Sequence, residues 1–320
     1  MTLEHIPAFF NIALLLIVIV GMAEFIRANI LDAHTIATEV VPYPLPVTPV
    51  SHLILTIEYY QATDQATVAE ILTFLNSVIV RHRGVSIHNL EGEDLAALNL
   101  YLYGSGGVLY DMATTTALWA CYGLIIPFGR KLYDPDECYP ATQRGEFEVV
   151  LDTTVPTSTL TNALISLSAV SLPGATPSHH LKATLSSVPA PGATGPNDVN
   201  LPIGNDLLAI LIGMTSFPGA SEYLFGADDL RLLFDNKELD IVSAKAPELL
   251  VEMINRIQAT NRSTISQFHM IPSLYTWMDF DPTRDGQYMI DTRTAARLKL
   301  RLNMGVNEAL NVTPVELVAL

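Results

Sequence analysis

Two parts of this 320-residue chain follow the same order of apolar and polar residues. Positions 53–102 recur at positions 207–256, a shift of 154 residues. The matches are of residue type and pattern: Leu53 with Leu207, Ile57 with Leu211, Val78 with Leu232, Val85 with Leu239 and Leu95 with Leu249. A repeat of this length far exceeds the roughly 20–50 residues of a solenoid unit. We therefore expect two copies of one domain.

Both copies predict the same order of secondary structure. In the first, a strand at 53–59 precedes a hairpin and a helix capped by Asp94. In the second, a strand at 206–212 precedes a hairpin that turns at 235–237 and a helix whose first residue is Pro247. Such units are typical of jelly-roll sandwiches. The predicted fold class is therefore all-β: two tandem jelly rolls with short helices and an N-terminal apolar segment.

The boundary between the copies is expected within residues 173–204, which are rich in proline and glycine. Short apolar runs such as Leu181–Leu185 interrupt this stretch, which favours a structured crossover over a flexible linker. The sequence thus divides into an apolar segment at 1–23, a first jelly roll at 24–178 and a second at 179–320.

The N-terminal segment Ile6–Ala23 is 18 residues long and carries no charge, which just reaches the length of a membrane-spanning helix. Three interpretations stay open. The segment can be a buried element beneath the first domain, or it can contact a membrane. It can also be a secretory signal, because Gly21-Met22-Ala23 resembles a cleavage site, although no Lys or Arg precedes it.

The composition restricts the partners of this chain. The net charge is −16, and binding to the phosphates of nucleic acid requires an excess of Lys and Arg, so direct nucleic-acid binding is not expected. The chain is 49% hydrophobic and only 16% charged. These values fit a protein that buries additional surface in an assembly or against lipid.

Two strands with clean alternation carry opposite charges. In one, Phe147, Val149 and Leu151 alternate with Glu146 and Glu148; in the other, Leu298, Leu300 and Leu302 alternate with Arg297, Lys299 and Arg301. The simpler interpretation is that each charged face is exposed to solvent. Our hypothesis is that the basic face contacts the acidic face in the same or a neighbouring subunit, and so guides the choice of partner.

No pattern for catalysis or cofactor binding stands out. A Gly-x-Ser-x-Gly elbow and a phosphate-binding loop are absent, and Cys121 and Cys138 do not form a Cys-x-x-Cys pair. Asp279, Asp281 and Asp285 weakly suggest a calcium loop, but position 290 is Ile where the loop requires Glu. A turn explains these aspartates as well. We therefore expect no enzyme activity, no cofactor and no metal.

Three passages in the tandem β-units carry a resemblance to a known family: Ile125–Arg130, Leu201–Asn205 and Asp279–Pro282. Over residues 24–320 the chain resembles the double jelly-roll major capsid proteins of tailless, membrane-containing icosahedral bacteriophages, of the corticovirus and tectivirus kind. The resemblance implies a homotrimer with a pseudo-hexagonal outline that tiles a viral shell, with no catalytic role.

The resemblance also implies partners and a location. The trimers would contact neighbouring capsomers and other capsid proteins such as the penton, in the virion capsid and, during assembly, in the host cytoplasm. Residues 6–23 would lie near the internal viral membrane. The alternative function is a tandem β-sandwich that binds carbohydrate or a receptor, like a spike. Tyr275, Trp277 and Tyr288 are its candidate binding residues, and the simpler interpretation is that they pack at the end of the second sandwich.

Overall fold

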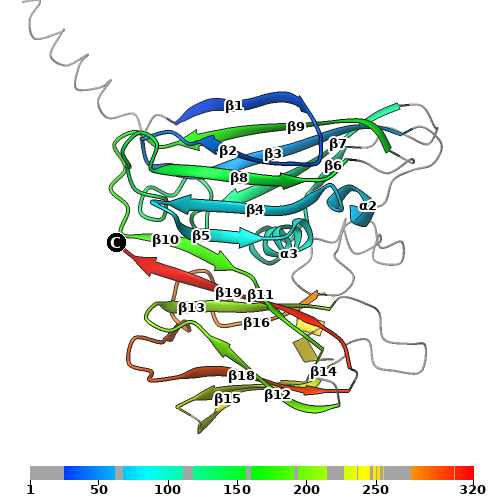
Figure 1. Cartoon of the computed structure of the whole chain (residues 1–320). Coiled ribbons are helices and arrows are strands. Elements are labelled where there is room, and N and C mark those ends of the chain that lie inside the picture. The colour runs from blue at the N-terminus through cyan, green and yellow to red at the C-terminus, as the bar shows by residue number, and fades with distance from the viewer. Residues whose placement is uncertain are drawn as a thin grey trace, which may run out of the picture.

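The computed structural model describes residues 25–61, 68–110, 118–155, 160–190, 194–214, 227–235, 237–245, 275–305 and 307–320, with residues 248, 249, 251, 252 and 255 of a further helix. The segment Ile6–Ala23 lies outside these residues. Within the described part of the chain, no helix is long and apolar enough to cross a membrane. The fold is all-β, as predicted: three sheets stack in layers (Figure 1).

The first half of the chain forms a pair of facing sheets, here called the first sandwich. One sheet is five-stranded, in the order β1 (Ile26–Thr35), β9 (Leu160–Ser171), β3 (Val50–Gln61), β7 (Leu118–Pro127) and β6 (Val108–Tyr110). The strands opposite it are β2 (Glu39–Pro44), β8 (Phe147–Thr153), β4 (Leu75–His82) and β5 (Val85–Leu90), in that order.

The second half forms the second sandwich. One of its layers has the order β16 (Tyr275–Asp279), β13 (Asp206–Met214), β19 (Leu310–Ala319) and β10 (His179–Thr184), with the short strands β11 (Ser186–Val188) and β17 (Ile290–Asp291) beside it. The opposite sheet is four-stranded, in the order β12 (Gly195–Leu201), β18 (Leu298–Met304), β14 (Ala227–Phe234) and β15 (Lys237–Lys245).

The two sandwiches share one topology. With the short strands β6, β11 and β17 set aside, the described part of each sandwich has eight strands. In each sandwich the first, eighth, third and sixth strands form one layer, and the second, seventh, fourth and fifth form the other. This is the strand order of a jelly roll, so the predicted tandem of two jelly rolls is confirmed.

Among the described strands, one parallel pair joins the sandwiches. β5 and β10 pair through His88 with Ala183 and Asn89 with Thr184. The layers on either side of this pair therefore form one ten-stranded sheet. In Figure 1 the first sandwich lies above the layer of β10, β19 and β13, and the four-stranded sheet lies below that layer. The predicted division at residue 178 falls just before β10 and stays a prediction.

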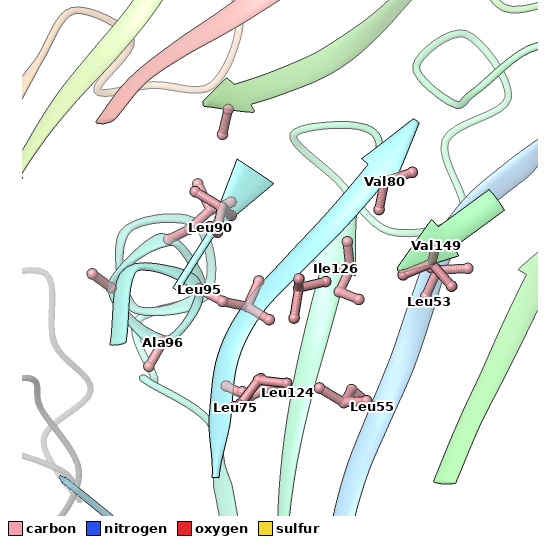
Figure 2. Close-up of a cluster of buried hydrophobic side chains, with 14 of the residues drawn as sticks. Leu53, Leu55, Leu75, Val80, Leu90, Leu95, Ala96, Leu124, Ile126 and Val149 are labelled. Atoms are coloured by element: carbon pink, nitrogen blue, oxygen red, sulfur yellow. The ribbon is translucent and has the colours of Figure 1, made fainter. Parts of the chain in front are cut away.

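The apolar core of the first sandwich continues into the second. Figure 2 shows Leu55 of β3 and Leu124 of β7 beside Leu75 of β4, all of them buried. Leu208 of β13 belongs to this same cluster, whereas Leu207 belongs to the core of the second sandwich. β13 is therefore buried on both faces, which explains its nearly continuous apolar sequence.

Two helices precede and follow the β4–β5 hairpin. α2 (Val68–Leu72) is a single short turn before β4, and α3 (Gly92–Tyr103) follows β5. The predicted cap residue was wrong: Glu91 caps α3, and Asp94 is its third residue. The Asp94 carboxylate accepts a hydrogen bond from the Glu91 backbone N–H at 3.2 Å, which completes a capping box.

The 154-residue shift holds for this helix start. Glu248, the counterpart of Asp94, likewise accepts a hydrogen bond from the backbone N–H of Lys245 at 3.1 Å. Leu95 and Leu249 are both buried, as predicted. Pro247, which we predicted as the first helical residue, lies outside the described residues.

The shift does not hold for every strand. The Phe128 N–H donates to the Ser51 carbonyl and the Phe280 N–H donates to the Leu208 carbonyl, so the shift is 152 between the phenylalanines and 157 between their acceptors. A register shift between Leu207 and Ala209 adds to the difference. As a result Leu211 faces the first sandwich, while its predicted match Ile57 lies in the core of its own sandwich. The repeat is one of elements rather than of aligned residues.

Candidate functional site: the seam between the sandwiches

The candidate site is the seam, which we define as α3, β5, β10, and the loops 128–138 and 280–286 that follow β7 and β16. α3 lies here because it leaves β5 next to the strand pair that joins the sandwiches. Asn99 fixes the helix to β7: its side chain donates to the Ile125 carbonyl at 2.7 Å and accepts from the Ile125 N–H at 2.9 Å. The seam therefore rests on backbone that is already held in a sheet.

A buried carboxyl connects the start of α3 to the second sandwich. The Tyr275 hydroxyl of β16 donates to Asp94 Oδ1 at 2.7 Å. Burial raises the pKa of Asp94 to about 7, although the Tyr275 hydrogen bond acts in the opposite direction, and Glu91 and Glu93 raise the pKa further. Asp94 is thus largely protonated at mildly acidic pH.

The end of α3 connects to the same strand through Tyr101. Its hydroxyl donates to Asp279 Oδ1 at 2.9 Å, and its ring meets the ring of Trp277 edge to face. The Arg284 guanidinium lies 3.9 Å from the centre of the Tyr101 ring and donates to the Tyr101 carbonyl at 2.7 Å. Aromatic, cationic and anionic groups therefore meet around one side chain.

A second cluster joins the loops that follow β7 and β16. Arg130 forms an ion pair with Glu137 in its own loop, and its Nη1 atom donates to Asp281 Oδ2 of the other loop at 2.9 Å. Burial opposes the charge of Arg130, but the hydrogen bonds that it donates to the Glu137 and Asp281 carboxylates raise its pKa overall. The Glu137 backbone lies so close to Gly129 that a larger residue would displace it. The three side chains are almost excluded from solvent, and one guanidinium group pairs with two carboxylates.

His88 lies where three segments of the seam meet. Its Nε2 atom donates to the Pro127 carbonyl at 2.7 Å, and its Nδ1 atom accepts from the Ala183 N–H at 3.2 Å. These two roles require the neutral imidazole. Burial lowers the pKa of His88 to about 4, which agrees with a neutral ring.

The chemistry of the seam is suited to fixing an angle between two bodies. Apart from Glu137, whose partner Arg130 lies in the same loop, the hydrogen-bonded charged groups and the imidazole described above have partners on the opposite side. Rotation of one sandwich against the other therefore breaks several bonds at once. In the described part of the chain, no group of three or more His, Cys, Asp and Glu side chains could hold a metal ion.

The three aspartates that weakly suggested a calcium loop have protein partners. Asp279 pairs with Arg284 at 3.4 Å, and Asp281 pairs with Arg130. Asp285 accepts a hydrogen bond from the Thr283 hydroxyl at 2.6 Å. Two of the three aspartates are therefore paired with arginine side chains.

The charged strand faces have partners within their own sheets. In β8, Glu148 pairs with Arg81 at 2.5 Å, and Glu146, just before this strand, pairs with Arg83 at 2.9 Å. In β18, Lys299 and Arg301 both pair with Asp198 of β12, and Arg297 lies exposed just before the strand. The described ion pairs do not bring the acidic and basic faces together in one chain. Contact between subunits stays a prediction.

The aromatic residues considered for carbohydrate binding are divided by the fold. Tyr275 and Trp277 are 4% and 2% exposed, because they lie in the seam. Tyr288 is 56% exposed. An exposed aromatic platform of all three residues is therefore not formed.

The cysteines Cys121 and Cys138 are both free.

Sequence reasoning missed most of the seam. It considered a metal and a turn for Asp279 and Asp281, and it assigned no contact to Arg130, Arg284 or His88. The passages that follow β7 and β16 carry residues of opposite charge, Arg130 and Asp281, but these two residues do not occupy corresponding positions of the repeat. The repeat alone therefore does not indicate that they form a pair.

No protein-family model matches the sequence, and no curated protein matches it. Solved structures do match. A chain of Sulfolobus Turreted Icosahedral Virus aligns with a TM-score of 0.70 and 12% identity over 92% of this chain and 91% of that one. This chain has the double jelly-roll fold. The major capsid protein P2 from bacteriophage PM2 aligns with a TM-score of 0.62 and 14% identity over 93% and 98% of the two chains.

A third match is VP54 of PBCV-1, with a TM-score of 0.58 and 9% identity over 92% of this chain and 94% of that one. The double jelly-roll alignment therefore spans both sandwiches in each protein. At these identities the similarity establishes the fold, and the resemblance of the sequence to double jelly-roll capsid proteins is confirmed at that level.

Proposed function

We propose that this chain is a structural major capsid protein that forms homotrimers, and that these trimers tile an icosahedral viral shell. The observation that carries the proposal is the fusion of two sandwiches of identical topology through one continuous sheet. Three such chains present six similar bodies, which can form a pseudo-hexagonal unit. A unit of this outline packs without gaps in a flat array.

The seam supports this proposal. A shell subunit must keep one angle between its two sandwiches so that every trimer has the same outline. The buried Arg130 cluster and the Tyr101 cluster hold this angle from two sides. A carbohydrate-binding or spike-like role has no such support, because two of its three candidate aromatic residues are buried.

The proposal includes the location and the partners of the trimer. It assigns the chain to the virion capsid after assembly in the host cytoplasm, in contact with neighbouring capsomers and with other capsid proteins such as the penton. Residues 6–23 contact the internal viral membrane. The acidic Glu146 and Glu148 face and the basic Arg297, Lys299 and Arg301 face meet between subunits. We propose no enzyme activity, no bound metal and no direct contact with the genome.

Electron microscopy of the purified full chain tests this function. We expect trimers that associate into curved sheets or closed shells as the protein concentration rises. A parallel glycan-binding assay tests the alternative. Particles that stay small at every concentration and bind a specific glycan would overturn the proposal.

A further inference from the structure

The contact that joins the sandwiches uses one particular pair of strand edges. β5 is the fifth of eight strands in the first sandwich, and β10 is the first of eight in the second. They pair in parallel, while the other paired strands of the described sheets are antiparallel. The fifth strand of one unit thus binds the first strand of the next.

The equivalent edges at the two ends of the chain have no strand partner in the described structure. The fifth strand of the second sandwich is β15, and its described pairing is with β14. The first strand of the first sandwich is β1, and its described pairing is with β9. Each edge therefore matches one side of a contact that the chain already makes internally.

The register of this second contact follows from the first. Ala183 of β10 lies opposite Val315, and Arg27 of β1 lies opposite Val170. Ser51 and Leu208 are equivalent because each accepts the hydrogen bond of the corresponding phenylalanine, so the next residues, His52 and Ala209, are equivalent too. His52 pairs with Val170 and Ala209 pairs with Val315. Val170 and Val315 are therefore equivalent. Arg27 is therefore the counterpart of Ala183.

The other strand is aligned through its hairpin. Leu90 of β5 and Ala244 of β15 each lie just before the cap of the helix that follows, so they are equivalent. Leu90 pairs with Val78, and Ala244 pairs with Leu230. Counting back from them makes Val242 and Ser243 the counterparts of His88 and Asn89. We propose that β15 of one copy pairs in parallel with β1 of a second copy, with Val242 opposite Arg27 and Ser243 opposite Ala28.

The sequence of the edges agrees with this pairing. Of the other edge strands, β2 and β12 carry Pro42, Pro44 and Pro196, which cannot donate to a neighbouring strand, whereas β6 and β16 contain no proline. β1 and β15 contain no proline. Bulges disturb β1 only after Asn29, so its first residues, where pairing is expected, stay regular.

The outer face of the five-stranded sheet also fits a second copy. Ile54 and Ile125 are the counterparts of Leu211 and Trp277, which α3 covers within the chain. In the described structure both isoleucines are half-buried. The helix equivalent to α3 carries Val251, which is 58% exposed. That helix of the second copy would lie over this sheet face.

A head-to-tail contact of this kind closes into a ring when its rotation permits. The inference rests on the proposed trimer, because three chains with one such contact each make a ring of six sandwiches. To the proposed trimer it adds which strands pair between two copies, that they run parallel, and which residues lie opposite each other.

A designed disulfide tests the pairing in the full chain. The variant carries Ala28→Cys and Ser243→Cys, with Cys121→Ser and Cys138→Ala to remove the native thiols. The control carries Thr35→Cys with Ser243→Cys, which moves one thiol along β1 by roughly 23 Å. After mild oxidation we expect covalent trimers in a denaturing gel for the first variant, lost on reduction, and none for the control.

The native mass of the unmodified chain separates the two claims. A trimer whose designed thiols cross-link no better than the control would overturn the strand pairing and leave the proposed function standing. A chain that stays monomeric at all concentrations would overturn both.

Discussion

Arg130 carries the charge that connects the two loops of the seam. Its guanidinium pairs with Glu137 and Asp281, and all three side chains are almost excluded from solvent. Removal of one partner from a buried ion cluster leaves the other charges uncompensated, which costs about 3–5 kcal/mol. We expect Arg130→Met to lower the free energy of unfolding by that amount in a urea titration.

Arg293→Met is the matched control, because Arg293 pairs with Asp206 and Asp291 while about half of its own side chain is exposed. Exposed pairs contribute about 0–1 kcal/mol. If both variants lose the same small amount of stability, the Arg130 cluster does not hold the sandwiches together.

Asp94 gives the seam a dependence on pH. Its pKa is about 7 in the folded chain, raised from an ordinary value of 3.8. Between these values the unfolded chain loses the proton while the folded chain keeps it. The contribution of Asp94 to the free energy of unfolding is therefore complete below pH 4 and is lost as the pH rises to about 7. The slope of this loss is at most about 1.4 kcal/mol per pH unit.

Asp94→Asn removes this titration and keeps the shape of the side chain. We expect the free energy of unfolding of the variant, relative to that of the wild type, to rise between pH 4 and pH 7 and then to level off. Urea titrations across this range measure the difference. Parallel curves for the two proteins would show that Asp94 ionises in the folded chain as it does in water.

At the scale of elements, the alternation of apolar and polar residues was the most reliable sequence signal for a strand and its buried face. The strands β8 and β18 have the predicted inward residues, and Phe147 and Leu300 are both buried. β13 has no alternation, because α3 covers the face that solvent covers in an ordinary half-buried strand. The start of α3 was misplaced because Asp94 serves as the third residue of a capping box and not as the cap.

The outer faces of β8 and β18 carry the predicted contact between subunits. A double exchange, Arg81→Glu with Glu148→Arg, keeps the ion pair within the sheet and reverses the charge at the acidic position. We expect a trimer of unchanged melting temperature that assembles less, because the exchanged arginine repels the basic Lys299 and Arg301 face of its neighbour.

Light scattering during assembly at low and high salt measures this effect. The single change Glu148→Gln is the control, since it removes the charge without reversing it and should reduce assembly less. Equal assembly of the wild type and the exchanged variant at low salt would limit these charges to a role within their own sheets.

At the scale of the whole molecule, the sequence predicted two copies of a jelly roll but not how they meet. The repeat is visible because the core positions of both copies must be apolar at the same places along the strands. The seam has no such periodicity: Arg130 and Asp281 belong to loops 151 residues apart, and only the fold brings them together. Charged residues in loops ordinarily face water, so their burial was not predictable from composition.

The central claim is that three chains make one pseudo-hexagonal unit. Electron-microscopic class averages of the purified particle test it most directly, because one image reports both the number of chains and their arrangement. We predict particles with threefold symmetry and six lobes, with a mass near three times the 34.9 kDa of the chain. Two-lobed particles with the mass of a single chain, at concentrations that favour assembly, would contradict the account.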